Sequence, residues 1–330
     1  LGGIAPTVTD ANLLLGRLGA DRFLGGEMML DSDAAARALQ DEIAAPLELD
    51  PTSAADGILR IAVTSMSHAV KGVTTERGLD AGDFTLVAYG GAGPLHASAV
   101  ARELGIGRVV VPRVPGVFSS FGMLFSDLRY DYVRTWFTRL DDAPFDRIEA
   151  VYGELEDQGR TAIAATTINA SEITVARAAD MRYVGQEHAV TVDLPMAVFD
   201  DGDREKIKTF FDEMHELRYG TSAPAERAEI VSLRSTIIGI MAKPPLERVS
   251  DGGAEPEAAA FTGTRSAYFT EVGEFALTPT YDRDALKSGN SIVGPALIEE
   301  HASTTVLLSS DSMMVDAFGN LVIKVAGRRR

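Results

Sequence analysis

The sequence predicts an α/β protein whose second half is α+β and ends in a β-rich region. Three observations support this class: an apolar run that passes through glycines into a helix, amphipathic helical stretches before that run, and strand-like segments after residue 257. The 330 residues allow two domains or one large one. We expect three regions, at 1–140, 141–245 and 246–330.

Three helices are expected before the glycine-containing stretch. The first covers 11–18 with Thr9 or Asp10 as its cap, the second covers 34–44, and the third carries an apolar stripe over 58–73. Apolar residues recur in these stretches at the 3.6-residue helical period. We therefore expect helix faces that pack on a sheet.

The stretch at 84–105 reads FTLVAYGGAGPLHASAVARELG and predicts a strand, a glycine loop and a helix. The run 84–89 is short, β-branched and aromatic, which favours a buried strand. Pro94 suits the first helical turn, and Gly105 stands where a helix would be capped. Because a second apolar strand follows at 109–111, the segment forms one parallel β-α-β unit.

The glycine loop lies at the edge of the sheet where ligands bind in such folds. Without a Cβ, Gly90, Gly91 and Gly93 let a ligand approach the backbone, and the helix that starts at Pro94 favours an anion. These four residues are therefore candidates for binding a nucleotide. The alternative is a tight turn that needs positive φ, since the loop matches neither GxGxxG nor the P-loop.

The rest of the chain predicts irregular stretches between further helices and strands. Residues 112–126 form either an interface loop or a packed connection that buries Phe118 and Phe121. An acidic, Pro-containing hinge is expected at 140–144, and a Pro-rich link at 244–257. Between them we expect a helix at 145–167, strands at 172–184 and 188–194, a helix at 203–218 and a strand at 229–241.

Composition excludes several classes of protein. A net charge of −17 and a pI near 4.7 argue against a nucleic-acid partner, which a basic patch would bind. The absence of cysteine excludes a disulfide framework and a thiol nucleophile in this chain, and the five histidines include no close ligand pair, so no metal site is predicted. No long apolar run and no signal peptide occur, which favours a soluble, cytoplasmic protein without a membrane segment.

Seven stretches carry a likeness to one known family. They are PTVTDANLLLGRL at 6–18, FLGGEMMLD at 23–31, LVAYGGAGPLHA at 86–97, VPGVFSSFGMLFSDL at 114–128, MRYVGQEH at 181–188, HELRYG at 215–220 and GPALIEEHASTTV at 294–306. In these stretches the chain resembles the hydantoinase A/5-oxoprolinase family, nearly from end to end.

The resemblance implies an actin-like ATPase fold, that of sugar kinases, Hsp70 and actin, with 1–140 as its second lobe and the glycine loop on the adenosine side. It also implies ATP and Mg²⁺, a hydantoinase B-like partner, and a reaction that opens a cyclic amide of the hydantoin or 5-oxoproline type by phosphoryl activation of the carbonyl. The alternatives are an acetone-carboxylase-type β subunit and a non-catalytic nucleotide-binding or scaffolding module.

The family's phosphate- and Mg²⁺-binding segments would lie upstream of Leu1. Because the chain starts with Leu and not Met, we expect it to be a piece of a longer protein. A phosphoryl-transfer site depends on its phosphate and metal clamps. The isolated chain is therefore expected to have little or no ATPase activity.

Two candidate catalytic residues come from the family-like stretches. Asp10 lies in the TDAN sequence and has either a direct role at substrate or metal, or the more common role of a helix cap. His188 follows Arg182, Gln186 and Glu187, a cluster that either binds an amide or carboxylate and moves protons, or simply lines a hairpin.

His96 and the stretch 299–301 are two further places where a structural role competes with a role in binding. His96, one turn into the helix after the glycine loop, either faces a ligand or packs inside. Glu299 and His301 would share one face of a strand and Glu300 the other, which leaves too few ligands for a metal. A solvated strand edge is expected there.

Overall fold

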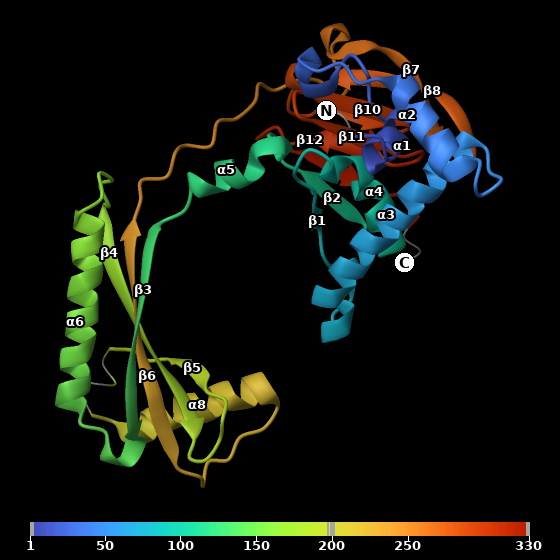
Figure 1. The fold of residues 1–330 in the computed structure, drawn as a ribbon. Helices are drawn as coiled ribbons and strands as arrows, with labels where there is room; N and C mark the ends of the chain where they lie inside the picture. Colours follow the sequence, from blue (N-terminus) through green and yellow to red (C-terminus); the bar gives the residue numbers. More distant parts are fainter. Residues whose placement is uncertain (1–2, 197, 199–201, 328–330) are drawn as a thin grey trace. The chain divides into compact units, whose positions relative to one another are not determined.

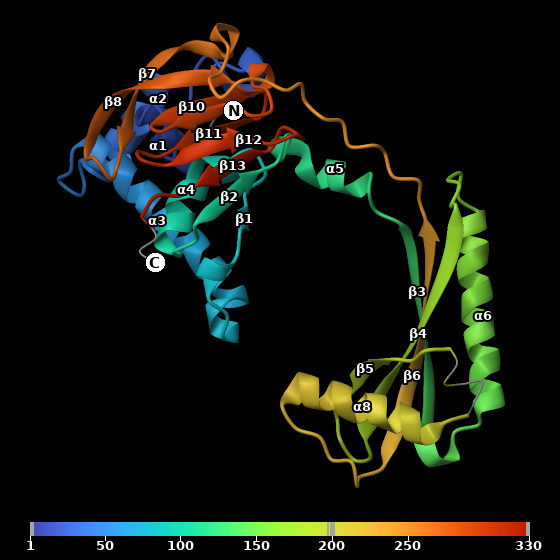
Figure 2. The same ribbon diagram turned by 180° about the vertical axis from the view of Figure 1, so that it is seen from behind.

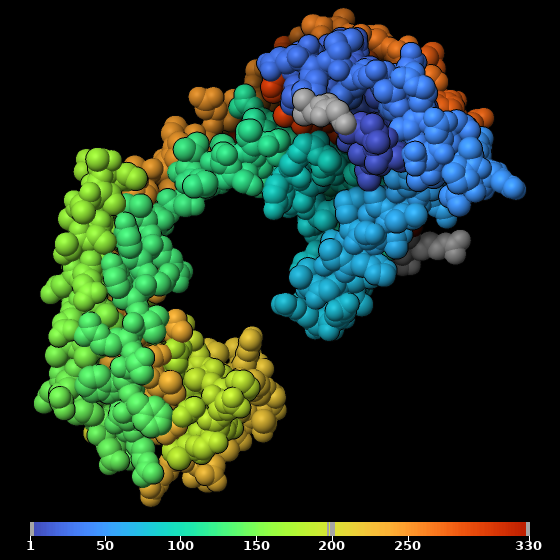
Figure 3. All heavy atoms as spheres, in the orientation of Figure 1, coloured from blue at the N-terminus to red at the C-terminus, as the bar shows by residue number. Residues whose placement is uncertain are grey.

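The computed structural model describes residues 3–196, 198 and 202–327, and it divides into two compact units (Figure 1). Unit 1 comprises residues 1–121 and 245–330, and unit 2 comprises residues 122–244. Atoms from the blue and the red ends of the sequence scale pack together in unit 1 (Figure 3). The first and last parts of the chain therefore share one body.

Unit 1 begins with the three predicted helices, α1 (Val8–Leu14), α2 (Ser32–Leu39) and α3 (Pro51–Val73). A π-helical turn at 40–44 follows α2 directly. Ala11, Leu15, Leu39 and Leu59 are buried where the three helices meet, as their apolar spacing indicates. The cap of α1 is Thr7, so this helix begins three residues before the predicted start.

The larger sheet of unit 1 combines both parts of the chain. Its strands, in spatial order, are β1 (Leu86–Val87), β2 (Arg108–Val111), β13 (Leu321–Lys324), β12 (Ser312–Val315) and β9 (Ser291–Val293). β1 and β2 are parallel and α4 (Gly93–Glu103) joins them, which confirms the predicted β-α-β unit. β13 lies antiparallel to β2, with Ile323 opposite Val109.

A second sheet of four strands lies beside the helices. Its order is β11 (Ser303–Leu307), β10 (Ala296–Glu300), β8 (Glu274–Asp282) and β7 (Phe261–Phe269). Figures 1 and 2, seen from opposite sides, show α1 and α2 on one face of this sheet. Leu13, Leu95, Phe269, Leu297 and Val306 form the core between them.

β1 is less buried than the sequence predicts. It pairs only with β2 and forms the edge of its sheet. Phe84, Val87 and Tyr89 are therefore 48%, 48% and 53% exposed. An edge strand has one neighbour instead of two, so an apolar run there does not require burial on every side.

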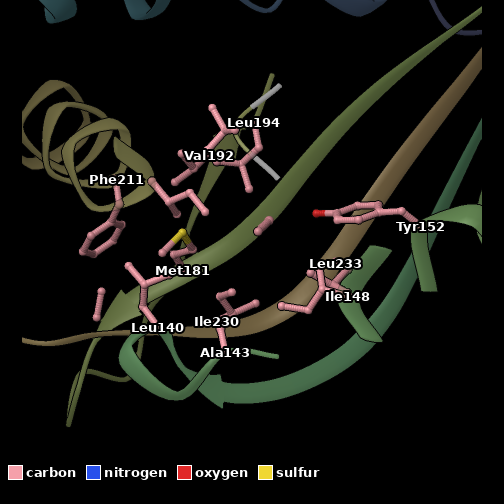
Figure 4. Close-up of a cluster of buried hydrophobic side chains, with 14 of the residues drawn as sticks. Leu140, Ala143, Ile148, Tyr152, Met181, Val192, Leu194, Phe211, Ile230 and Leu233 are labelled. Carbon is pink, nitrogen blue, oxygen red and sulfur yellow. The ribbon is translucent and has the colours of Figure 1, made fainter. Parts of the chain in front are cut away.

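In its described residues, unit 2 is an antiparallel sheet on which α6 (Phe145–Ala164) and α8 (Arg204–Tyr219) pack. The strand order is β3 (Leu128–Arg139), β6 (Ala228–Ile240), β4 (Glu172–Tyr183) and β5 (Val190–Asp193). The helix side chains Tyr152 and Phe211 are buried against Met181 and Leu233 of the sheet (Figure 4).

The compact units do not coincide with the three predicted regions. The expected hinge at 140–144 lies inside unit 2, because Leu140 and Ala143 are buried in its core and Arg204 donates hydrogen bonds to their carbonyl oxygens at 3.2 and 2.8 Å. The β-rich part after residue 245 is not separate from the first region, because β13 pairs with β2.

Unit 1 passes into unit 2 within the stretch 112–126. This stretch is partly helical, with α5 (Phe118–Met123) in place of an irregular loop. The rings of Phe118 and Phe121 are stacked 6.3 Å apart, and both are half-buried. In the described part of the chain, no helix is long and apolar enough to cross a membrane.

Gly159 allows α6 to approach β6 closely. A Cβ there would lie 2.5 Å from Cγ1 of Ile237, whereas a Cβ at Gly153 of the same helix would meet nothing within 4 Å. We expect Gly159→Ala to lower the free energy of unfolding by about 1–2 kcal/mol, because overpacking exceeds the gain in helix propensity.

The matched variant Gly153→Ala should raise the free energy of unfolding by up to about 1 kcal/mol. Urea titration followed by the fluorescence of Trp136, the single tryptophan and part of β3, measures both effects. Equal effects of the two substitutions would contradict the close packing.

Candidate functional site

Four stretches of unit 1 meet around a cavity of about 230 Å³. They are the start of α1, the turn that follows it, the glycine loop and the β10–β11 hairpin. The lining residues are Thr9, Leu18, Gly19, Arg22, Phe23, Leu24, Gly91, Ala92, Leu95, Glu299, Glu300, His301, Ala302, Ser303 and Thr304. We call this space the loop cavity.

The glycine loop forms one wall of the loop cavity. Gly90 has φ +85° and donates its N–H to the carbonyl oxygen of Pro115 at 2.7 Å, so the positive φ that the sequence allows is present. A Cβ at Gly91 would lie 3.0 Å from the carbonyl oxygen of Ala302, and Ser303 Oγ donates to the Gly91 carbonyl at 3.1 Å. The loop therefore depends on close approach to the hairpin.

α4 begins directly after this loop. Gly93 is its first residue, Pro94 lies in its first turn, and no side chain caps its N-terminus. Amide groups without helical partners at such an end attract negative charge. Gly91 and Ala92, which precede them, line the cavity.

The turn at residues 23–26 forms a second wall. Leu24 has φ 51° and the next two glycines have φ 64° and 89°, all in the left-handed region. This conformation costs a non-glycine residue about 1–2 kcal/mol, and such strain is common at functional sites. A Cβ at Gly25 would lie 2.6 Å from Nδ1 of His301, so this turn also packs on the hairpin.

Two buried ion pairs hold the hairpin strand in place. Arg265 Nη2 lies 2.8 Å from Glu299 Oε1, and Arg283 Nη1 lies 2.9 Å from Glu300 Oε1. Both glutamate side chains are only 11% exposed, so the expected solvated edge is wrong. The sequence does not reveal this arrangement, because Arg265 comes from β7 and Arg283 from the turn directly after β8.

Burial changes the acidity of Glu300. It raises the pKa of this carboxyl from 4.5 to about 7, and the nearby Arg283 only partly opposes the shift. Burial also lowers the pKa of Arg283. For both partners the loss of water outweighs the pairing, which is common for buried ion pairs. Glu300 can therefore gain or lose a proton near neutral pH.

The candidate Asp10 lies outside the lining of the loop cavity. Its carboxylate accepts hydrogen bonds from the N–H and the hydroxyl of Thr7, each at 2.7 Å, and completes a capping box at the start of α1. This geometry matches the cap alternative. A role of Asp10 in catalysis stays a hypothesis.

The candidate His188 belongs to unit 2, where it is exposed after β4. Arg182 in this cluster pairs with Glu229 at 2.7 Å and donates to the carbonyl oxygen of Glu187 at 3.3 Å. Gln186 and Glu187 are also exposed. The geometry matches the hairpin alternative, and among the described residues no hydrogen-bond partner orients His188 as a base.

His96 is packed inside unit 1 and is 4% exposed. Burial, and then the charge of Arg17, lowers its pKa to about 4, so the imidazole is neutral at physiological pH. It does not line the loop cavity. Among residues 3–196, 198 and 202–327, no three His, Asp or Glu side chains are grouped as metal ligands, and we assign no ligand to Mg²⁺.

Several lining residues were not predicted, namely Thr9, Arg22, Ser303 and Thr304. The fold brings them together from positions almost 300 residues apart, which no local pattern shows. The one available signal was that all of them lie in or beside the stretches that resemble a single family.

Two family models match most of the chain. The model described as Hydantoinase/oxoprolinase matches residues 1–132, and the one described as Hydantoinase/oxoprolinase C-terminal domain matches residues 141–324. An uncharacterized protein of Methanocaldococcus jannaschii is 35% identical over 98% of this chain and 45% of its own length. Caprolactamase subunit alpha of Pseudomonas jessenii is 33% identical over 93% of this chain and 44% of its own length.

Solved structures give the same fold. The crystal structure of ATP-dependent caprolactamase from Pseudomonas jessenii matches 99% of this chain and 48% of that chain, with a TM-score of 0.76 and 29% identity. A nucleotide-free structure of acetone carboxylase matches 96% of this chain and 46% of that chain, with a TM-score of 0.83 and 24% identity. The predicted α/β class is confirmed, and the chain spans less than half the length of these relatives.

The raised pKa of Glu300 predicts a pH-dependent stability. The unfolded chain releases this proton near pH 4.5 and the folded one near pH 7, so stability falls as pH rises across that interval. Glutamine does not titrate, so we expect Glu300→Gln to gain stability relative to the wild type, by up to about 3 kcal/mol, between pH 4.5 and 8.

Urea unfolding followed by far-UV circular dichroism at pH 4.5 and at pH 8 measures the difference in the free energy of unfolding between the wild type and Glu300→Gln. In the Glu300→Gln variant Arg283 also loses its charged partner, which changes the free energy of unfolding by an amount that does not depend on pH over this range. A difference that stays constant with pH would contradict the raised pKa.

Proposed function

This chain belongs to the hydantoinase/oxoprolinase family, and on that premise we propose that unit 1 binds the nucleoside part of ATP in an enzyme that opens cyclic amides. The observation that supports this proposal is the position of the glycine loop. It follows β1 at its carboxyl end, leads into an uncapped helix and lines the loop cavity. Nucleotides bind at this edge in open parallel sheets.

The size and lining of the loop cavity suit a nucleoside. Its volume of about 230 Å³ lies below the roughly 300–1,000 Å³ of sites for whole drug-sized ligands, which suits one part of a larger molecule. Leu18, Ala92 and Leu95 offer apolar surface to a base. The hydroxyls of Ser303 and Thr304 offer hydrogen bonds to a ribose or to ring nitrogens.

The chain's own groups have separate roles in this proposal. The amide groups at the start of α4 favour the negative charge of a phosphate tail. Glu300 is the carboxyl group of the cavity that can exchange a proton near neutral pH. ATP supplies a phosphoryl group that makes the unreactive carbonyl of a cyclic amide susceptible to attack by water.

The similarity to caprolactamase supports a cyclic amide, and not a ketone, as the substrate proposed for this chain. The alpha subunit of caprolactamase is 33% identical to this chain, whereas the acetone carboxylase structure, at 24% identity, supports the fold alone. Because that relative is a subunit, we also propose a partner subunit or domain of the hydantoinase B type. The exposed turn at 185–188 in unit 2 is the proposed contact.

The test is calorimetric titration of this chain with ADP and Mg²⁺. We expect the wild type to bind and Gly91→Val to bind at least about tenfold more weakly, because the added isopropyl group takes space from the cavity and crowds Ala302. The control Gly57→Val places the same group in α3, where a Cβ meets nothing within 4 Å, and should bind as the wild type does.

Circular dichroism of each variant would confirm that it is folded. The absence of ADP binding to the wild type, or equal binding by the two variants, would contradict the proposal. Binding and not turnover is measured, because the chain spans less than half the length of its relatives.

A further inference from the structure

A second cavity of about 240 Å³ lies in unit 1 and shares no lining residue with the loop cavity. It is lined by the turn after α1, by residues of α3 and α4, by the segment after β7 and by the residue directly after β11. These residues are Arg17, Leu59, Arg60, Val63, Thr64, Ala99, Glu103, Thr270, Glu271 and Leu308. We call it the arginine cavity.

Arg17 is the most buried charge of this cavity, with 3% of its surface exposed. Its Nε donates to the carbonyl oxygen of Tyr268 at 3.3 Å and its Nη2 to Thr270 Oγ1 at 3.4 Å, and both distances are long. Thr270 Oγ1 in turn donates to Asp56 at 2.5 Å. Among the residues that the structure describes, the hydrogen-bond partners of the guanidinium are therefore neutral oxygens.

No carboxylate lies within 4 Å of Arg17 among the residues that the structure describes. Burial lowers the pKa of this guanidinium, although arginine stays protonated in proteins. A buried charge is costly unless an opposite charge compensates it. The charges of Glu271 and Asp56 oppose the effect of burial on Arg17 only in part and without an ion pair. Since Arg17 lines an open cavity, an anion that enters could supply a carboxylate in direct contact.

The other charged side chains of the cavity differ in whether they have partners within the protein. Glu271 accepts a hydrogen bond from the N–H of Ser309 at 2.9 Å and lies 3.7 Å from Arg102. Arg60 and Glu103 are exposed, and within the described ranges neither has an ion-pair partner within 4 Å. The cavity thus combines a buried cation with a free carboxylate, and Leu59, Val63, Ala99 and Leu308 supply apolar surface between them.

We propose that the arginine cavity binds a small amino carboxylate, with its carboxylate against Arg17 and its ammonium group toward Glu103. Arginine binds carboxylates through strong, charge-assisted hydrogen bonds. The choice of ligand rests on the proposed function. When water opens a cyclic amide, the C–N bond breaks, the carbonyl carbon gains an oxygen and the nitrogen gains a hydrogen, which yields an amine and a carboxylate in one molecule.

The proposed site therefore recognises the class of product that the enzyme would release, at a place apart from the loop cavity. The test uses this chain without nucleotide, titrated by calorimetry with 5-aminopentanoate, pentanoate and pentylamine. We expect 5-aminopentanoate to bind most tightly, pentanoate more weakly and pentylamine not at all. Binding of pentylamine alone, or of none of the three compounds, would overturn the proposal.

Variants assign the two contacts separately. Arg17→Gln should weaken the binding of both carboxylates by about tenfold or more, whereas Arg77→Gln, which removes the same charge from an exposed turn after α3, should leave it unchanged. Glu103 is exposed on α4. We expect the Glu103→Gln variant to bind 5-aminopentanoate only as tightly as it binds pentanoate.

The Glu103 variant keeps the proposal testable if Arg17→Gln does not fold. Equal affinity of the wild type and of Glu103→Gln for 5-aminopentanoate would overturn the assignment of the ammonium group. The titration contains no nucleotide, so it is independent of the titration with ADP. If none of the three compounds binds, the proposal for the arginine cavity fails and the proposal for the loop cavity does not. If ADP does not bind, the reverse holds.

Discussion

The buried guanidinium of Arg283 connects the elements that form the loop cavity. Its Nη2 donates hydrogen bonds to the carbonyl oxygens of Val111 and Pro112, at the end of β2, and of Gly319, just before β13. Its Nη1 pairs with Glu300 on β10. One side chain therefore ties the larger sheet to the hairpin of the second sheet. Together with the Arg265–Glu299 pair and the hydrogen bond from Ser303 to Gly91, this link positions the hairpin against the glycine loop.

Glycines then allow the walls of the cavity to come together. A Cβ at Gly91 would lie 3.0 Å from the carbonyl oxygen of Ala302, a tight contact, and one at Gly25 would lie 2.6 Å from Nδ1 of His301, whose ring would have to move. The strained turn at Leu24 persists because the hairpin packs against it. The arrangement is thus fixed by backbone approach and buried charge together, and it leaves Glu300 with a pKa near 7 at the cavity wall.

Local structure could be predicted well from the sequence. The first three helices of the chain, the parallel β-α-β unit and the helix after Pro144 follow from apolar periodicity and from proline or glycine at several of their ends. β3 was not predicted, although its side chains alternate between half-buried and exposed along the whole strand. The apolar alternation in the sequence is regular only over 128–132, because Val133 and Phe137 beyond it are exposed.

The candidate site was only half predictable, for a physical reason. The glycine loop carries its signal within a few residues, whereas the pairs of Glu299 and Glu300 depend on arginines of other strands. The same holds for Arg17, whose burial follows from packing between α1 and the segment after β7. For Asp10 the motif left two alternatives, a role in chemistry and a helix cap; the carboxylate completes the cap, and its role in chemistry stays a hypothesis.

The central claim is that the glycine loop and the β10–β11 hairpin together bind a nucleoside. Hydrogen–deuterium exchange of this chain, with and without saturating ADP and Mg²⁺, tests it most directly. The account predicts slower exchange of the amides at 88–95 and 299–304, and unchanged exchange in the sheet of unit 2. Protection that spares both of these stretches, or that appears only in unit 2, would contradict it.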